Sequence, residues 1–295
     1  MGANMTSPAD VQRLLDADHD DPFSVLGPHK AGGGRVVTAF DPGAARVSAL
    51  VGDQTFPLDP VEGAPGLFRG PVAGTDPYTL RGETDEAAWD WDDPYRFGPV
   101  LGEIDEYLLG EGNHLRLWEA LGAHVTEHEG TRGTHFAVWA PNARRVSLVG
   151  DFNLWDERRT PMRRRGGTGV WEIFVPGLGD GALYRYDIKG VDGSTQPRKA
   201  DPVGFGSEHP PANASIVRDI SGYGWSDDLW MHTRPERHDR RAPISIYEVH
   251  LGSWRRKDNN EYLGYRELAD ELVDYVSDMG FTHIEFLPAD LFHHE

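Results

Sequence analysis

Two aromatic side chains and several polar ones lie close together in the segment Gly150-Asp151-Phe152-Asn153-Leu154-Trp155-Asp156. Flat aromatic rings stack on the C–H face of a sugar, while nearby amide and carboxylate groups hydrogen-bond to its hydroxyls. The segment therefore has the chemistry of a carbohydrate-binding loop. A second interpretation fits equally well, in which Phe152 and Trp155 only cover the end of a hydrophobic core. The residue types alone leave both interpretations open.

Other candidate chemistry is weaker. Glu248 and His250 are two residues apart and share one face of a strand, where they could bind a metal or form an acid/base pair. Packing in the protein interior is favoured, because no third ligand can be identified. The terminal His293-His294-Glu295 has metal-binding composition, yet such an end is usually solvated. Because no dinucleotide, phosphate-loop or nucleophile-elbow motif occurs, we expect no metal and no cofactor.

The aromatic loop follows a predicted β-hairpin. Phe136 and Val138 alternate with Ala137 and Trp139, which is the two-residue period of a strand with two different faces. After a turn at residues 141–142, the alternation resumes and leads into the loop.

Two further strands follow the loop in the sequence. Trp171, Ile173 and Val175 share one face of the first, and Tyr184, Tyr186 and Ile188 share one face of the second. Arg185 and Asp187 then point the other way, toward solvent or a ligand.

An altered copy of this region lies upstream. Residues 37–42 match 136–141, residues 46–48 match 145–147, and residues 66–68 match 169–171, in the same order. Ordered matches predict a duplicated module, and each copy is expected to form its own domain with its own core. The first copy has no Trp in the loop after Gly52-Asp53. If either copy binds a glycan at this position, it is therefore the second.

Composition limits the partners. The 295-residue chain has 48 acidic and 29 basic residues and a formal net charge of −19, which disfavours nucleic acid. Basic clusters at 158–165 and 234–241 are interpreted as solvated hairpin and linker faces, with a nucleic-acid patch as the less favoured alternative. There is no cysteine and hence no disulfide. Without a signal-peptide core or a membrane-spanning run, we predict a cytoplasmic monomer with no membrane partner.

Short helices are expected beside the strands. Ser7-Pro8-Ala9-Asp10 predicts a helix start, with Val11, Leu14 and Leu15 on one side. Residues 111–121 predict a helical connector, with Leu115, Trp118 and Leu121 on one face.

The periodicity changes after a predicted linker at 235–241. An apolar run at 243–250, a helix at 265–279 closed by Gly280, and a second strand at 281–288 form a parallel β-α-β unit. Such strands need cover on both faces, so one unit is not a complete domain. We therefore expect further structure to be missing from this chain.

The order of these motifs resembles the amino-terminal part of the bacterial 1,4-α-glucan branching enzymes of the α-amylase superfamily. Residues 21–29 (D-P-F-S-V-L-G-P-H) resemble the opening of the family's extra amino-terminal domain, and 136–156 resemble its glycogen-binding sandwich. Residues 247–254 (Y-E-V-H-L-G-S-W) resemble the first strand of its barrel. Residues 264–268 and 280–288 resemble the barrel's first helix and second strand.

The resemblance implies a mainly β chain, with two tandem immunoglobulin-like β-sandwiches followed by an incomplete (β/α)8 barrel of one β-α-β unit. The implied domains are an N-terminal helix or leader (1–21), a first sandwich (22–110), a second sandwich (111–232), the start of the barrel (243–288) and an aberrant tail (289–295). The superfamily's catalytic carboxylates come from later barrel strands, and no residue here matches them. We therefore predict that this chain alone is inactive.

The resemblance also implies an α-glucan partner, such as glycogen or amylose-like chains. Trp155 matches the family's loop Trp, Arg185 its basic residue after a strand Tyr, and Asn213 its contacting Asn. Trp139 completes the candidate glucan-binding set. The family's second Trp has no counterpart, because residues 192–196 lack an aromatic, so weak binding is expected. The alternative is a free-standing, non-catalytic glycan-binding or regulatory protein. A debranching or trehalose-forming relative is a weaker third interpretation.

Overall fold

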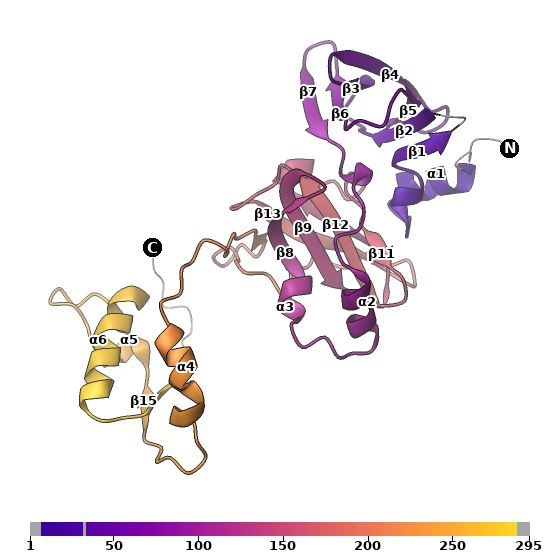
Figure 1. Ribbon diagram of the computed structural model, residues 1–295. Helices are drawn as coiled ribbons and strands as arrows, with labels where there is room; N and C mark the ends of the chain where they lie inside the picture. Colours follow the sequence, from indigo (N-terminus) through magenta and orange to yellow (C-terminus); the bar gives the residue numbers. More distant parts are fainter. Residues whose placement is uncertain (1–6, 32–33, 288–295) are drawn as a thin grey trace. The chain divides into compact units, whose positions relative to one another are not determined.

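The computed structural model describes residues 7–31 and 34–287 (Figure 1). The chain is mainly β and divides into two compact units, Met1–Gly222 and Tyr223–Glu295. The first unit holds two β-rich modules, here called the first module (strands β1 to β7) and the second module (β8 to β14). Among the described residues, no helix has the length and apolar character needed to cross a membrane.

The first module is one antiparallel sheet in the order β1-β2-β5-β4-β3-β6-β7. Strand β4 links its two halves, since its earlier residues pair with β3 while Asp59 and Pro60 pair with β5. Side chains from β2 to β6 enclose one core that includes Val37, Ala49 and Phe68. The strands are β1 (Gly27–Ala31), β2 (Gly34–Phe40), β3 (Arg46–Val51), β4 (Gln54–Pro60), β5 (Leu67–Val72), β6 (Thr79–Glu83) and β7 (Ala88–Asp92).

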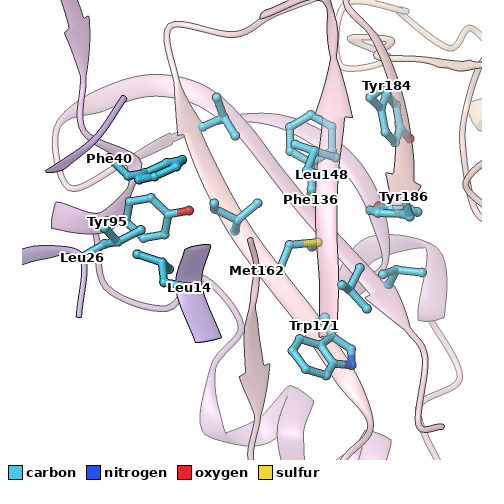
Figure 2. Close-up of a cluster of buried hydrophobic side chains, with 14 of the residues drawn as sticks. Leu14, Leu26, Phe40, Tyr95, Phe136, Leu148, Met162, Trp171, Tyr184 and Tyr186 are labelled. Atoms are coloured by element: carbon cyan, nitrogen blue, oxygen red, sulfur yellow. The ribbon is translucent and has the colours of Figure 1, made fainter. Parts of the chain in front are cut away.

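The second module has two sheets, with strand orders β11-β12-β9-β8 and β10-β13-β14. Phe136, Leu148, Trp171, Tyr184 and Tyr186 meet between them and are fully buried (Figure 2). The predicted common faces of β12 and β13 are thus confirmed at these positions. The strands are β8 (Gly122–His128), β9 (Thr131–Trp139), β10 (Ala143–Gly150), β11 (Arg163–Arg165), β12 (Val170–Pro176), β13 (Leu183–Gly190) and β14 (Ser215–Ile216).

Strand register is equivalent at matching positions of the two copies. Phe40 pairs with Leu67 between β2 and β5, and the matching Trp139 pairs with Val170 between β9 and β12. Equivalent glycines add a second correspondence. Gly66 and Gly169 have φ values of +82° and +79°, and a Cβ on either would lie 2.7 Å from an atom of Pro42 or Pro141, respectively. The two copies therefore share strand pairing as well as sequence.

The two modules do not have fully separate cores, in contrast to the expectation from the duplication. Leu14, Leu26, Phe40 and Tyr95 belong to the same buried cluster as the second module's interior, and Figure 2 shows them beside its strands. The Tyr95 hydroxyl donates to the carbonyl oxygens of residues 159 and 161, at 3.3 and 3.2 Å. A continuous apolar contact therefore joins the copies.

The arginines of residues 158–165 are not simply a solvated face. Arg159 pairs with buried Asp41 of the first module at 2.9 Å. Arg163 donates to the Phe97 carbonyl at 2.6 Å and lies over the Phe23 ring, 3.4 Å from its centroid. Burial lowers the pKa of Arg163 to about 10. These guanidinium groups hold the modules together, because each finds its partner on the preceding part of the chain.

The helix predictions had mixed outcomes. Helix α1 (Pro8–Leu15) is confirmed, and the Ser7 side chain caps it by accepting from the Asp10 N–H. The predicted helix at 111–121 is wrong, because α2 (Glu103–Gly110) ends before it and α3 (Leu117–Ala120) is a single turn. Gly112, with φ +70°, lies in the intervening turn, and Leu115 is 87% exposed. Three short 3-10 helices complete the first unit: η1 (Pro22–Ser24), η2 (Pro94–Arg96) and η3 (Asp151–Asn153).

The second unit contains the predicted β-α-β arrangement. Strands β15 (Ile246–Val249) and β16 (His283–Phe286) pair in parallel, and α6 (Tyr265–Asp278) lies between them in sequence. Gly280, with φ +81°, follows the helix end as expected. Met279, the last residue of the predicted helix, is 58% exposed. Two helices were not predicted. They are α4 (Asp228–Arg237), which replaces part of the linker, and α5 (Leu251–Trp254).

Candidate carbohydrate-binding site

The loop after β10 holds Trp155 in a constrained position. Leu154 and Trp155 have φ values of 59° and 58°, a region that costs residues with side chains about 1–2 kcal/mol each. The buried Asn153 amide fixes the loop, because its Oδ1 accepts from the Gly150 N–H and its Nδ2 donates to the Leu148 carbonyl, both at 2.9 Å. Backbone strain of this kind is often found where a side chain is positioned for function.

The two aromatics of the loop take different roles. Phe152 packs against the hydrophobic core, whereas Trp155 remains half-exposed. The indole Nε1 of Trp155 donates to Asp151 Oδ1 at 2.7 Å, which orients the ring. The core-capping interpretation therefore fits Phe152, and the stacking interpretation is left to Trp155.

Arg185 lies beside this ring. It is on β13 opposite Val149 of β10, while its neighbours Tyr184 and Tyr186 point into the core. Its Cζ is 5.9 Å from the centroid of the Trp155 ring. Its Nε is buried and makes no hydrogen bond within the described part of the chain. On the outer face of the three-stranded sheet, Trp155 thus presents an aromatic ring and Arg185 presents a hydrogen-bond donor.

Asp187 does not face a ligand, contrary to expectation. It is buried, and its Oδ1 accepts from Arg145 Nη1 at 2.7 Å. Its Oδ2 lies 3.4 Å from the Nε of Arg198, whose Nη2 donates to the Trp155 carbonyl at 2.8 Å. Asp187 and Arg198 therefore hold the Trp155 loop in place. Arg198 was missed from the sequence, because it lies 43 residues from the group it binds.

The remaining two candidates lie in different places. Asn213 is exposed and lies two residues before β14, whose Ser215 pairs with Tyr184 in the sheet that carries Arg185. Trp139 ends β9 in the other sheet and is 59% exposed. It lines an apolar pocket of about 270 Å³ together with residues of α2, of α3 and of the segment between them. Arg185 therefore lies on one sheet, with Trp155 and Asn213 in segments next to strands of that sheet, whereas Trp139 lies on the other sheet.

No group of three or more potential metal ligands occurs in residues 7–31 and 34–287. Glu248 is exposed on β15 rather than packed in an interior. The segment 293–295, singled out for its metal-binding composition, and the aberrant tail that contains it lie outside the described residues.

A buried acid–histidine pair has the composition of a catalytic site, but its contacts include a backbone N–H and an arginine of the surrounding structure. Glu172 Oε2 accepts from His135 Nε2 at 2.9 Å and from the Leu101 N–H at 3.0 Å, and Oε1 lies 3.1 Å from Arg165. Burial lowers the pKa of His135. Burial alone would raise the pKa of Glu172, but its donors and Arg165 outweigh that effect and lower it. The pair fastens the connection between the modules to the four-stranded sheet.

Comparison with known families identifies both modules. Residues 7–95 match the amino-terminal domain of the alpha-1,4-glucan branching enzyme GlgB, and residues 120–204 match carbohydrate-binding module 48, the isoamylase N-terminal domain. The second match includes Trp155 and Arg185 but ends before β14. The first unit thus has the organisation of a modular carbohydrate-active protein.

Relatives then specify the family. The chain is 56% identical over 294 residues to the 1,4-alpha-glucan branching enzyme GlgB of Roseobacter denitrificans and 54% identical over 285 residues to that of Rubrobacter xylanophilus. These alignments cover 97% and 94% of this chain but only 40% and 38% of the relatives. The chain therefore corresponds to the amino-terminal portion of the bacterial GlgB branching enzymes.

Among solved structures, apo pullulanase from Klebsiella pneumoniae is 17% identical, with a TM-score of 0.42, over 85% of this chain and 32% of its own. That similarity is too low to support any argument about fold or function.

Proposed function

We propose that this chain is the glucan-binding amino-terminal part of a 1,4-α-glucan branching enzyme. Such an enzyme transfers a cleaved α-1,4-glucan segment to a 6-hydroxyl and uses paired carboxyl groups that retain the anomeric configuration. The 56% identity to a GlgB enzyme along nearly the whole chain supports this assignment. No residue of the chain matches the catalytic carboxylates, so the chain alone should leave the iodine–amylose absorbance unchanged.

The same proposal includes the finer architecture. It divides the chain into two tandem immunoglobulin-like sandwiches, at 22–110 and 111–232, and the first β-α-β unit of a (β/α)8 barrel at 243–288. The matching strand registers support the first part, and the parallel pairing of β15 with β16 supports the second. A monomeric state, a cytoplasmic location, and the lack of nucleic-acid and membrane partners stay predictions from composition.

Glucan binding is assigned to the outer face of the β10-β13-β14 sheet. The observation that carries this assignment is the half-exposed Trp155 ring, held by a strained loop beside the unpaired Nε of Arg185. The ring offers an apolar face to a sugar, and the guanidinium offers donors to its hydroxyls. Asn213 adds an amide to the same sheet. A single stacking ring should give weak binding.

Binding of maltoheptaose to the full chain, measured by titration calorimetry, tests this assignment. We expect Trp155→Ala to weaken binding up to about tenfold, because one aromatic stacking contact contributes about 0.5–1.5 kcal/mol. Trp139→Ala is the matched control, because it removes an exposed indole from the other sheet. Equal losses in both variants, or a loss only in Trp139→Ala, would reject the Trp155 site.

A further inference from the structure

A cavity of about 410 Å³ lies between the two modules of the first unit. Trp89 and Trp91 of β7 form one wall, and Phe152 and Leu178 of the second module lie among the residues of the other. Trp89 and Trp91 are two residues apart on one strand, so they share a face. The volume lies in the range of small-molecule sites, which are mainly apolar with a few convergent polar groups.

Polar groups converge on the cavity from both modules. Asp41 is 1% exposed, and it accepts from the Trp89 indole Nε1 at 2.9 Å and pairs with Arg159 Nη2 at 2.9 Å. The Nε of Arg159 is buried and makes no hydrogen bond within the described residues. This Nε lies 4.0 Å from Oδ2 of Asp156. A buried donor without an acceptor is costly, and a ligand oxygen would remove that cost.

The charges around the cavity favour a neutral ligand. Four aspartates but a single arginine line it, namely Asp41, Asp90, Asp92, Asp93 and Arg159, so the lining disfavours an anion. Arg159, Arg81 and Arg96 pair with Asp41, Asp90 and Asp92, respectively, and Asp93 accepts from the Tyr78 hydroxyl. A cation would therefore have to compete with partners that these carboxylates already have. A neutral molecule with hydroxyls and an apolar face satisfies both the rings and the polar groups.

We propose that this cavity is a second carbohydrate site, which takes a short stretch of α-glucan against Trp91 and Phe152 with its hydroxyls at Asp41 and Arg159. The identity of the ligand rests on the proposed function, whereas the cavity does not. Phe152 and Trp155 then serve two sites from one loop, with Phe152 facing the cavity and Trp155 the outer sheet. The first module contributes one wall, which gives it a direct part in glucan binding.

Indole NMR signals of the ¹⁵N-labelled full chain, titrated with maltose, separate the two sites. We expect the Trp89 and Trp91 signals, assigned with Trp89→Phe and Trp91→Phe, to shift saturably. Trp91→Ala should raise the Kd reported by Trp89 up to about tenfold. Leu178→Tyr, which fills the cavity from the opposite wall, should abolish the Trp89 shift. Trp155→Ala, outside the cavity, should leave that shift unchanged.

The outcomes of this titration distinguish the cavity site from the Trp155 site. Shifts at Trp89 and Trp91 that Leu178→Tyr removes support the cavity site, whether or not Trp155 responds. A response of Trp155 alone overturns the cavity site and leaves the proposed function intact. No response at any of the three indoles rejects both. Shifts at Trp89 that persist unchanged in Leu178→Tyr and Trp91→Ala also overturn the cavity site, because maltose would then act from elsewhere.

Discussion

At the scale of single residues, equivalent positions of the two modules share a buried acid. Asp93 accepts from the Tyr78 hydroxyl at 2.5 Å, and Asp201 accepts from those of Tyr184 and Tyr186 at 2.8 and 3.0 Å. Each carboxylate precedes a proline and also accepts a backbone N–H two residues on. Burial raises the pKa of both carboxyls, that of Asp93 to about 6. Both acids anchor core tyrosines, and Asp93 also lines the cavity between the two modules.

The raised pKa makes stability depend on pH. Because the folded state holds the Asp93 proton more tightly than the unfolded chain, the stabilisation is complete below about pH 4. It is lost as the pH rises through about 6. Relative to Asp93→Asn, the wild-type free energy of unfolding should fall by up to about 3 kcal/mol between pH 4 and 7. Urea unfolding across that range measures the difference.

Asp53→Asn is the control for this prediction, since it removes an exposed carboxylate from a turn of the same module. Its stability should follow the wild-type pH curve. A constant offset between Asp93→Asn and the wild type would show that Asp93 does not titrate in this range.

At the scale of elements, a two-residue period predicted the strands well, and the matched segments predicted a second, related module. The helix at 111–121 was wrong because Leu115, Trp118 and Leu121 recur at helical spacing while Gly112 turns the chain with a positive φ. Helix α4 was missed because it accommodates Pro235 in its last turn. The hydrogen bond from Arg198 to the Trp155 carbonyl could not be predicted, because only the tertiary fold brings these two residues together.

The glycine–proline contact that occurs in both modules can be tested by substitution. Gly169→Ala should be strongly destabilising, because its Cβ would lie 2.7 Å from the Cβ of Pro141 in addition to the strain of φ +79°. Gly177→Ala is the matched control, with φ +72° and no atom within 4 Å of the new Cβ. We expect about 1–2 kcal/mol for the control and clearly more for Gly169→Ala. Equal losses in thermal unfolding would show that the contact relaxes freely.

At the scale of the whole molecule, the two units differ in how well they bury apolar surface. The first unit has an extended core shared by both modules, in which Phe136, Trp171, Tyr184 and Tyr186 are fully buried. Among the described residues of the second unit, few apolar side chains are buried, namely Val249, Leu268, Leu272 and Val276. Parallel strands normally require cover on both faces. On β15 and β16, however, Ile246 and Phe286 are 52% and 56% exposed.

This difference predicts that the second unit opens first. Local opening depends on how little apolar surface a region buries, so proteases should cut within residues 223–287 well before they cut the first unit. Limited digestion with chymotrypsin, followed by mass spectrometry, should leave a resistant fragment that ends near Tyr223. Cleavage at similar rates in both units would mean that the small core around Val249 is enough to hold the β-α-β unit closed. The exposed faces of β15 and β16 would then need no further cover for stability.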